Sequence, residues 1–361
     1  MAEKHFTRRK PHRASPDRKP DGVLSKQLAA ELGVSVSTVS RAFSSHASIA
    51  PETREKVLQR AREIGYRPNP FARTLITRKN DIVAILVSDL ANPFYPAVLS
   101  LLTSSLQKAG FNVMLFAYSE AHSMDQTVCD ALRYQPDVLI ALAVTVSSQA
   151  AHRATEAGTR VLFFNRYIPA ADAVSVTCNN IGGAAAVADY LVDRGHRDLV
   201  YVSGHPDTTT NLDRLSGFSC RCVERTGRAP RLVEAGEFSH GAGFASARAL
   251  FAQGDVPDAV FCANDVVALG VLDAARECDL DVPARLSVVG FDNIELADWG
   301  SYGLTTYRQP VAEMIEATVA MVRRISSELA TVIADVVLDG GIVERRTVAD
   351  RRSTTAGAGA P

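Results

Sequence analysis

The sequence predicts an N-terminal all-α helix-turn-helix headpiece followed by an α/β domain of two lobes, each built on a doubly wound parallel sheet. Over residues 24–43, apolar side chains recur at helical spacing on both sides of a glycine. From residue 81 onward, short apolar runs alternate with helical patterns, which is typical of buried parallel strands. Charge divides the chain at the same place, since residues 1–80 hold 17 Lys and Arg against 7 Asp and Glu.

The totals describe an ordinary globular protein. With 361 residues, 47% of them hydrophobic and 22% charged, the chain is long enough for two or three domains with their own cores. It has no apolar run of about 18 residues and no signal-peptide pattern, so we expect a cytoplasmic protein without membrane contact. Its six cysteines are scattered without CxxC pairs, which suits a reducing compartment. A metal shared by Cys220 and Cys222 remains an alternative.

Residues 1–20 are rich in Arg, Lys, His and Pro and show no apolar periodicity, so we expect a disordered basic arm. Such an arm could add phosphate contacts to a nucleic acid and steepen the salt dependence of binding. It could equally be an artefact of the chosen translation start. The basic charge of the whole first part favours a nucleic-acid partner.

Residues 21–66 are predicted to form the headpiece. Gly33 supplies the turn, and Ser35 is placed to cap the second helix. Helical spacing puts Val39, Ala42 and Phe43 on the inner side of that helix, and it puts Val36, Ser37, Ser40 and Arg41 on the outer side. A small, hydrogen-bonding, singly basic face fits a DNA major groove. An ordinary αα-hairpin is the alternative.

The third helix is expected to begin at Pro51 and to end at Gly65. Residues 67–80 follow as a hinge and linker, in which Asn69 can cap a helix of barely more than one turn. Nucleation costs such a short helix more than its few hydrogen bonds return. We therefore expect it to fold only against a partner.

The run AxxxGVSxxTVSR at residues 29–41 closely resembles the DNA-binding headpiece of the LacI/GalR family of bacterial transcription regulators. This resemblance implies a repressor that binds a near-palindromic double-stranded operator as a homodimer. It assigns the reading of the major groove to Val36, Ser37, Thr38, Ser40 and Arg41. In the hinge it implies roles for Asn69, Arg73 and Leu75, with Leu75 as a wedge in the minor groove. Packing of Leu75 on the following domain is the alternative.

Residues 81–350 are predicted to be an effector-binding and dimerisation domain. Its buried strands are expected at residues 82–87, 112–117, 138–142, 161–164, 199–202, 259–262 and 286–289. This part resembles the two-lobed periplasmic-binding-protein fold of the same family. We expect an N-lobe of residues 81–177 and 311–334, and a C-lobe of residues 178–310 and 335–350. The tail, residues 351–361, is expected to be disordered, and its lack of heptads favours a dimer over a tetramer.

An effector of such a fold lies in the crevice at the carboxyl ends of the strands. The positions there that also match the family's pocket motifs are Phe94, Tyr95, Asn165, Arg166, Arg214, Asn264, Asp292 and Gln309. Their chemistry favours a small hydroxylated effector, such as a sugar or a sugar derivative. Structural alternatives exist: core packing for the two aromatic residues, helix capping for Asn264 or its neighbour Asp265, and a structural ion pair for Arg214, with Asp213 or another acid. For Asp292 a purely structural role also stays open.

Two other classes of function share the fold. A transport binding protein would lack a basic headpiece, and an enzyme would need a catalytic motif. The sequence contains no GxxxxGK[ST], HExxH or GxSxG pattern, and its eight histidines lie singly. We therefore expect no enzymatic activity, no cofactor and no metal site.

Overall fold

The computed structural model describes residues 21–43, 49–66, 80–88, 90–118, 123–142, 146–168, 173–254, 256–327 and 334–352. The chain divides into two compact units, Met1–Asn80 and Asp81–Pro361. The predicted arm, the predicted hinge with Asn69, Arg73 and Leu75, and most of the predicted tail lie outside the described residues. Within the described part, no helix combines the length and apolar character needed to cross a membrane.

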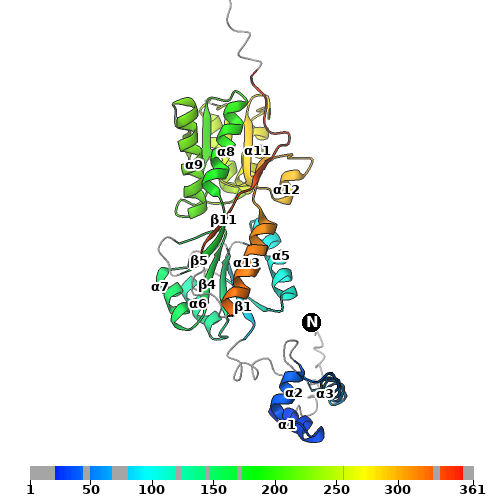
Figure 1. Cartoon of the computed structure of the whole chain (residues 1–361). Helices are drawn as coiled ribbons and strands as arrows, with labels where there is room; N and C mark the ends of the chain where they lie inside the picture. The colour runs from blue at the N-terminus through cyan, green and yellow to red at the C-terminus, as the bar shows by residue number, and fades with distance from the viewer. Residues whose placement is uncertain are drawn as a thin grey trace, which may run out of the picture. The chain divides into compact units, whose positions relative to one another are not determined.

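The headpiece, drawn in blue in Figure 1, consists of α1 (Asp21–Glu31), α2 (Val36–Ala42) and α3 (Pro51–Glu63). A small apolar core joins the three helices, formed by Leu28, Ala29, Val39, Ala42, Val57 and Ala61. Arg60 on α3 adds ion pairs to Glu31 of α1 at 2.7 Å and to Glu63 at 2.9 Å. The core is small, so the geometry of α2 depends strongly on its own ends.

The ends of α2 follow the sequence prediction. Gly33 turns the chain with a φ of 63°, a conformation that glycine adopts without a Cβ penalty. Ser35 is the N-cap, and its Oγ accepts a hydrogen bond from the backbone N–H of Thr38 at 3.0 Å. At the far end of the headpiece, α3 begins at Pro51. The cap matters because α2 has only 7 residues.

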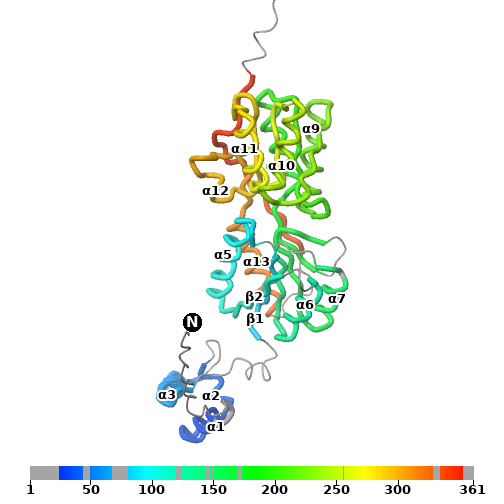
Figure 2. Tube along the Cα trace, turned by 180° about the vertical axis from the view of Figure 1, so that it is seen from behind, coloured from blue at the N-terminus to red at the C-terminus, as the bar shows by residue number. Residues whose placement is uncertain are grey.

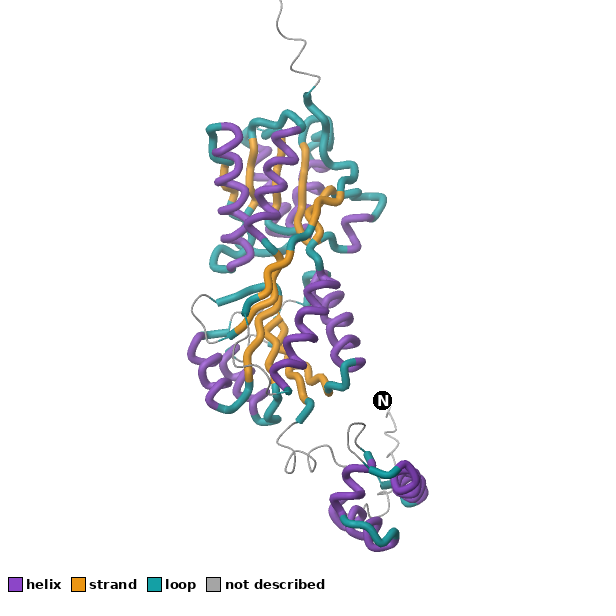
Figure 3. The backbone as a smooth tube through the Cα atoms, viewed as in Figure 1, coloured by secondary structure: helices purple, strands orange, loops and turns teal. Residues whose placement is uncertain are grey.

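The N-lobe contains the first of two six-stranded sheets, in the order β11-β5-β4-β3-β1-β2. Its strands are β1 (Ile82–Val87), β2 (Asn112–Ala117), β3 (Val138–Leu142), β4 (Arg160–Phe164), β5 (Val174–Cys178) and β11 (Val336–Leu338), and all pair in parallel. Helices α5 (Phe94–Lys108) and α13 (Val311–Ser326) cover one face, and α6 (Met124–Leu132) and α7 (Ser148–Glu156) cover the other (Figures 1 and 3).

The C-lobe contains the second sheet, in the order β12-β10-β9-β8-β6-β7. Its strands are β6 (Leu199–Val202), β7 (Arg231–Val233), β8 (Ala259–Cys262), β9 (Ser287–Asp292), β10 (Thr305–Arg308) and β12 (Gly341–Val343), of which only β12 pairs antiparallel among those described. Helices α8 (Asn180–Asp193) and α9 (Thr209–Thr226) cover one face, and α10 (His240–Ala252) and α11 (Asp265–Glu277) cover the other (Figure 2); α12 (Glu295–Asp298) is short.

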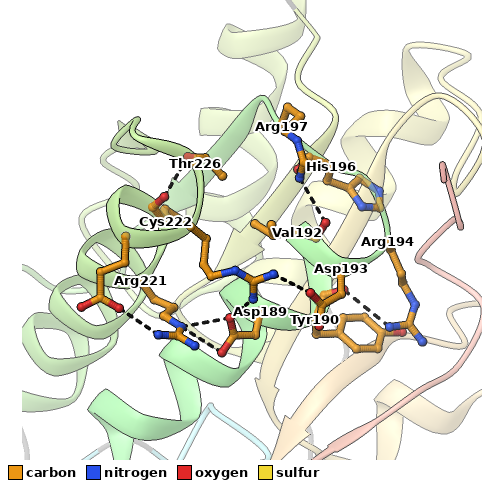
Figure 4. Close-up of polar contacts among 12 residues, drawn as sticks. Asp189, Tyr190, Val192, Asp193, Arg194, His196, Arg197, Arg221, Cys222 and Thr226 are labelled. Atoms are coloured by element: carbon orange, nitrogen blue, oxygen red, sulfur yellow. Dashed lines mark hydrogen bonds and ion pairs between the residues drawn. The ribbon is translucent and has the colours of Figure 1, made fainter. Parts of the chain in front are cut away.

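Helices α8 and α9 are joined by a group of ion pairs on their outer side (Figure 4). Asp189 of α8 accepts from Arg221 at 2.9 Å and also from Arg225, which reaches Asp193 at 2.6 Å. Beneath them the backbones approach closely, since a Cβ on Gly217 would lie 2.2 Å from the carbonyl oxygen of Ile181. Glycine therefore permits the close contact, and the surface ion pairs add a modest contribution.

Each lobe repeats one topology, in which the first strand lies between the second and the third. This arrangement confirms the predicted fold class of two doubly wound parallel sheets.

The chain crosses between the lobes after β5, before α13 and after β11. The last crossing corrects the predicted lobe boundary, because residues 336–338 were assigned to the C-lobe. They still pair with β5 in the N-lobe, where Leu338 is opposite Cys178, so the crossing falls between Leu338 and Gly341.

Candidate functional site

The outer side of α2 carries the side chains predicted to read DNA. Val36 is 43% exposed, Ser37 and Arg41 are exposed, and Ser40 is half-buried, while Val39 between them is buried in the headpiece core. The Nε of Arg41 donates to the backbone oxygen of Ser37 at 3.4 Å, which lays the guanidinium along the helix surface. The exposed face therefore offers one cation, two hydroxyls and one apolar side chain.

Thr38 has a different environment from its neighbours. Its Oγ1 lies 2.8 Å from the Oγ of Ser35, and Ser37 Oγ lies 2.7 Å from the same oxygen. Thr38 is half-buried, so its hydroxyl belongs to the capping group of α2. Its side chain helps to fix the start of the helix from which the exposed residues project.

A cavity of about 580 Å³ lies between the lobes of the second unit. Its N-lobe wall comes from the first turns of α5 and α13, and its C-lobe wall comes from the loop after β9 and the end of β10. Of the predicted effector residues, Phe94, Asp292 and Gln309 line this cavity. The other predicted residues do not line it: Tyr95, Asn165, Arg166, Arg214 and Asn264. Arg214 nevertheless bonds to Asp292, which lines the cavity, and Asn165 bonds to Tyr95, the neighbour of Phe94.

Arg214 lies buried behind the cavity. Its Nε donates to Asn180 Oδ1 at 2.9 Å, its Nη1 to the carbonyl oxygen of Ala263 at 2.6 Å, and its Nη2 lies 3.4 Å from Asp292 Oδ1. The guanidinium carbon also lies 3.7 Å from the ring centroid of Phe291. The acid that pairs with Arg214 is thus Asp292 and not its sequence neighbour Asp213.

Asp292 sits at the end of β9 in a strained backbone conformation. Its φ is 121° and that of Asn293 is 62°, values that L-residues rarely adopt and that are found at ligand sites. Its Oδ1 accepts from Gln309 Nε2 at 2.7 Å as well as from Arg214. Burial raises the pKa of this carboxyl to about 6, although the charge of Arg214 and the bond from Gln309 act in the opposite direction.

Asp265 holds the strained loop in place, a role that the sequence did not reveal. One carboxylate oxygen accepts from the backbone N–H of Ile294 at 2.8 Å, and the other accepts from the hydroxyl of Thr306 on β10. A Cβ on Gly290 would lie 2.1 Å from that second oxygen, so the glycine makes room for the carboxylate. Burial and the nearby charge of Asp292 raise the pKa of Asp265 to about 8.

Two of the N-lobe residues predicted for the effector, Asn165 and Arg166, follow β4. Asn165 has a φ of 71°, and its Nδ2 donates to the hydroxyl of Tyr95 at 3.4 Å. Asn165 Oδ1, Arg166 Nε and Gln309 Oε1 are buried and have no hydrogen-bond partner in the described part of the chain. Buried polar atoms are normally paired, so each of these atoms is a candidate for a hydrogen bond from a ligand, and Gln309 is the one of the three residues that lines the cavity.

The structure shows the structural roles that were the alternatives for Asn264, Phe94 and Tyr95. Asn264 is the N-cap of α11, since its Oδ1 accepts from the backbone N–H of Val267 at 2.9 Å. Phe94 and Tyr95 are each 5% exposed and pack edge to face with ring centroids 5.3 Å apart. Phe94 nevertheless forms part of the cavity wall, so it packs in the core and also faces a ligand.

A bond across the cleft joins the lobes. The hydroxyl of Tyr167 donates to Asp213 Oδ1 on α9 at 3.1 Å, and the backbone N–H of Tyr167 donates to Thr209 Oγ1 at 3.4 Å. Neither residue of the first pair was predicted to act at the site. The signal for Tyr167 was its position two residues after Asn165, at the end of a parallel strand.

A metal shared by the two neighbouring cysteines does not fit the structure. Cys220 is exposed and Cys222 is buried on α9, because residues two apart on a helix point in nearly opposite directions. The described residues contain no cluster of three or more His, Cys, Asp or Glu side chains that could hold a metal ion.

Two family models match different parts of the chain. The model described as bacterial regulatory proteins, lacI family, matches residues 26–69, and the model described as a periplasmic binding protein-like domain matches residues 188–348. The HTH-type transcriptional repressor CytR of Escherichia coli K12 is 28% identical over 292 residues, which cover 80% of this chain and 85% of CytR. The chain thus carries a lacI-family helix-turn-helix domain followed by a periplasmic-binding-protein-like domain.

Other LacI-family proteins are similar over comparable lengths. The transcriptional regulator CelR of Thermobifida fusca is 29% identical over 313 residues, covering 84% of this chain and 92% of CelR. The crystal structure of the lac repressor dimer bound to operator and an anti-inducer matches with a TM-score of 0.77 and 25% identity, covering 89% of this chain and 98% of that chain. A CelR–cellobiose complex matches with a TM-score of 0.67 and 25% identity, covering 90% and 99%. The proteins that are similar along most of this chain are therefore transcription regulators.

The raised pKa of Asp265 predicts a pH-dependent stability. Between its unfolded and folded pKa values, the native state holds a proton that the unfolded state has lost, so stability falls as pH rises towards 8. We expect wild-type protein to lose up to about 1.4 kcal/mol of unfolding free energy per pH unit in this window, and Asp265→Asn to lack this slope.

Denaturant unfolding of the second unit from about pH 6.5 to 8, above the pKa of Asp292, checks this expectation. Asp207→Asn is the control, because Asp207 lies exposed in a turn. Equal slopes for wild type and Asp265→Asn would contradict the raised pKa.

Proposed function

We propose that this LacI-family regulator is a repressor that binds a near-palindromic operator as a homodimer and that a small hydroxylated effector controls this binding. The observation that carries the proposal is the exposed face of α2, held by a capped helix start in a headpiece that matches the family model. Recognition of base edges needs donors, acceptors and an apolar contact on one narrow helix face.

In this proposal Val36, Ser37, Thr38, Ser40 and Arg41 meet the major groove. Arg41 carries the one guanidinium of the face, which can donate in a bidentate manner to guanine O6 and N7. Val36 is apolar and exposed, as a contact to a thymine methyl requires. In the hinge, Asn69, Arg73 and Leu75 are proposed to order on DNA, with Leu75 entering the minor groove.

The effector is proposed to occupy the cavity between the lobes. Phe94, Asp292 and Gln309 line it, and the buried unpaired atoms of Asn165, Arg166 and Gln309 support a polar ligand at the cleft. The similar CelR is seen in complex with cellobiose. This supports a sugar or sugar derivative here. Because binding energies are linked, an effector that weakens operator binding is itself bound less well by the operator complex.

The homodimer is proposed to use an apolar edge of the N-lobe. Leu115 on β2 is 50% exposed, and Leu101 on α5 is 53% exposed. Val113 packs in the same core as α5, so Leu115, two residues further along the strand, faces the same side. Leu115 therefore lies at the free edge of the sheet, where β2 is the last strand, and Leu101 lies on the neighbouring α5, where it also lines the cavity between the lobes. A second copy of the chain would bury them.

Replacing Arg41 with Ala is expected to relax specificity at one position in each operator half-site, by about 1–3 kcal/mol. The operator can be selected from random duplexes and each base pair then varied in quantitative binding assays. Arg62→Ala, which removes an exposed guanidinium of α3, is the control and should leave the sequence preference unchanged. A uniform loss across all sequences for Arg41→Ala would indicate a phosphate contact instead.

Replacing Asp292 with Ala is expected to abolish the response of operator binding to the effector and to leave operator binding intact. Since that change strands the charge of Arg214 in the interior, Asp292→Asn keeps a hydrogen-bond acceptor and serves as the second variant. The effector is first found by thermal-shift screening of sugars, sugar acids, polyols and nucleosides. Fluorescence anisotropy of labelled operator then measures the response. If both variants still respond fully, the effector binds at another site.

Replacing Leu115 with Lys is expected to weaken self-association by about 2 kcal/mol or more, because a buried leucine at an interface centre would become a charge. Sedimentation velocity over a range of protein concentrations measures the change. Leu212→Lys is the matched control, since Leu212 is 51% exposed on α9 of the other lobe. Equal association of both variants would place the dimer contact on another surface.

A further inference from the structure

The cavity between the lobes presents mainly negative charge to a ligand. Among the described residues that line it, four are acids, Asp292, Glu295, Glu313 and Asp339, and Arg308 is the one base. Glu295 and Glu313 form no ion pair within the described part of the chain, while Asp339 accepts from Asn179 Nδ2 at 2.8 Å. An anionic ligand would meet repulsion here, and a cation would meet attraction.

The cavity also offers hydrogen-bond acceptors. Gln309 is 2% exposed, and its Nε2 is used in the bond to Asp292, while its Oε1 has no partner among the described residues. Asp292 accepts both of its bonds through Oδ1, which leaves Oδ2 without a donor from the described chain. Gln309 Oε1 is therefore a buried acceptor that a donor on a ligand can satisfy, and Asp292 Oδ2 is a second acceptor at the cavity.

Arg214 does not reverse this balance. All three of its nitrogens already donate within the C-lobe, to Asn180, Ala263 and Asp292, and it is 2% exposed. Its positive charge is paired with Asp292, so the pair as a whole contributes no charge that could hold an anion. The unpaired acids at the rim determine the sign of the cavity.

The remaining wall is apolar. Phe94 and Val98 of α5 face Ile294 of the C-lobe loop and Val311 of α13, with Pro93 and Pro310 beside them. A ring with one apolar face fits against such a wall, as the C–H face of a sugar does. The cavity therefore combines an apolar wall with acceptors and carboxylates.

We propose that the effector is a hydroxylated amine, the chemical class of an amino sugar. Its ammonium group is held by Glu295 and Glu313, and its hydroxyls donate to Gln309 Oε1 and Asp292 Oδ2. An ammonium brings three donors and no acceptor, which suits these acceptors and the carboxylates that form no ion pair. This inference rests on the proposed function, because it names the class of ligand for the same cavity.

The test compares rings that differ only in charge. Calorimetry at about pH 6.5, where an amine with a pKa near that of an α-amino group is protonated, measures glucosamine, glucose and glucuronate, and the galactose set in parallel. We expect at least one amine to bind about tenfold more tightly than its neutral parent, with no detectable binding of the acid, and we expect 1 M salt to reduce the preference. An amine that binds no better than its parent in either set overturns the inference.

A double variant tests the contribution of the two carboxylates while the rest of the cavity is unchanged. Glu295→Gln combined with Glu313→Gln should bring the ratio of amine to neutral affinity close to one. Glu316→Gln, an exposed acid of α13 outside the cavity lining, should leave the ratio unchanged. An unchanged ratio in the double variant overturns the assignment of the ammonium site.

The outcome also distinguishes the inference from the proposed function. A neutral or anionic compound from the broader screen that binds and shifts operator affinity leaves the proposed function standing and overturns the inference. If no compound of any charge binds and changes operator affinity, the proposed function itself fails.

Discussion

The pairing of Arg214 with Asp292 is the constraint on which the rest of the cleft depends. An isolated charge in the interior costs several kcal/mol, so each of these two residues requires the other. Because their Nη2 and Oδ1 atoms must meet, the end of β9 is fixed against α9, and Gln309 is drawn to the same oxygen. The 3.4 Å separation is longer than an optimal charged hydrogen bond. The strongest bonds of Arg214 go instead to Ala263 and Asn180, so the arginine is fixed independently of the ligand site.

The strain at Asp292 and Asn293 explains why Asp265 is buried without a cation. Two successive residues with positive φ cost free energy that other bonds must offset. Asp265 supplies the bond to Ile294 at the end of that loop and a second bond to Thr306, so one carboxyl joins the loop to the next strand. Its raised pKa is the electrostatic cost of this arrangement. Below this pKa the Asp265 carboxyl keeps its proton, so the C-lobe presents Asp292 at the cavity without a second buried charge beside it.

Local sequence patterns predicted most of the fold, whereas they could not predict which residues pair across long distances in the chain. The cap at Ser35 and the strand at residues 82–87 follow from spacing alone, and both agree with the structure. The sequence alone cannot tell whether Asn264 or the adjacent Asp265 caps α11. The extended backbone at Asn264, with a φ of −152°, identifies Asn264 as the N-cap. The partner of Arg214 lies 78 residues further along the chain. The strand β11 has 3 residues, too few to show a period, which is why the lobe boundary was misplaced.

The cavity is lined in part by the segments that cross between the lobes, so a ligand bound there contacts these segments directly. Gln309 and Pro310 belong to one crossing and Asp339 and Gly340 to another, and all four line the cavity. The two crossings are tied together, since the backbone N–H of Gly340 donates to the hydroxyl of Tyr307 at 2.9 Å. A ligand that prefers one arrangement of these segments shifts the balance between lobe closures by its difference in affinity and by no more than that. Full reversal from 1:99 to 99:1 needs about 5.5 kcal/mol, which is more than one surface ion pair supplies. An effector that produced so large a shift would need several contacts, and this cavity offers both crossings and the C-lobe loop to one ligand.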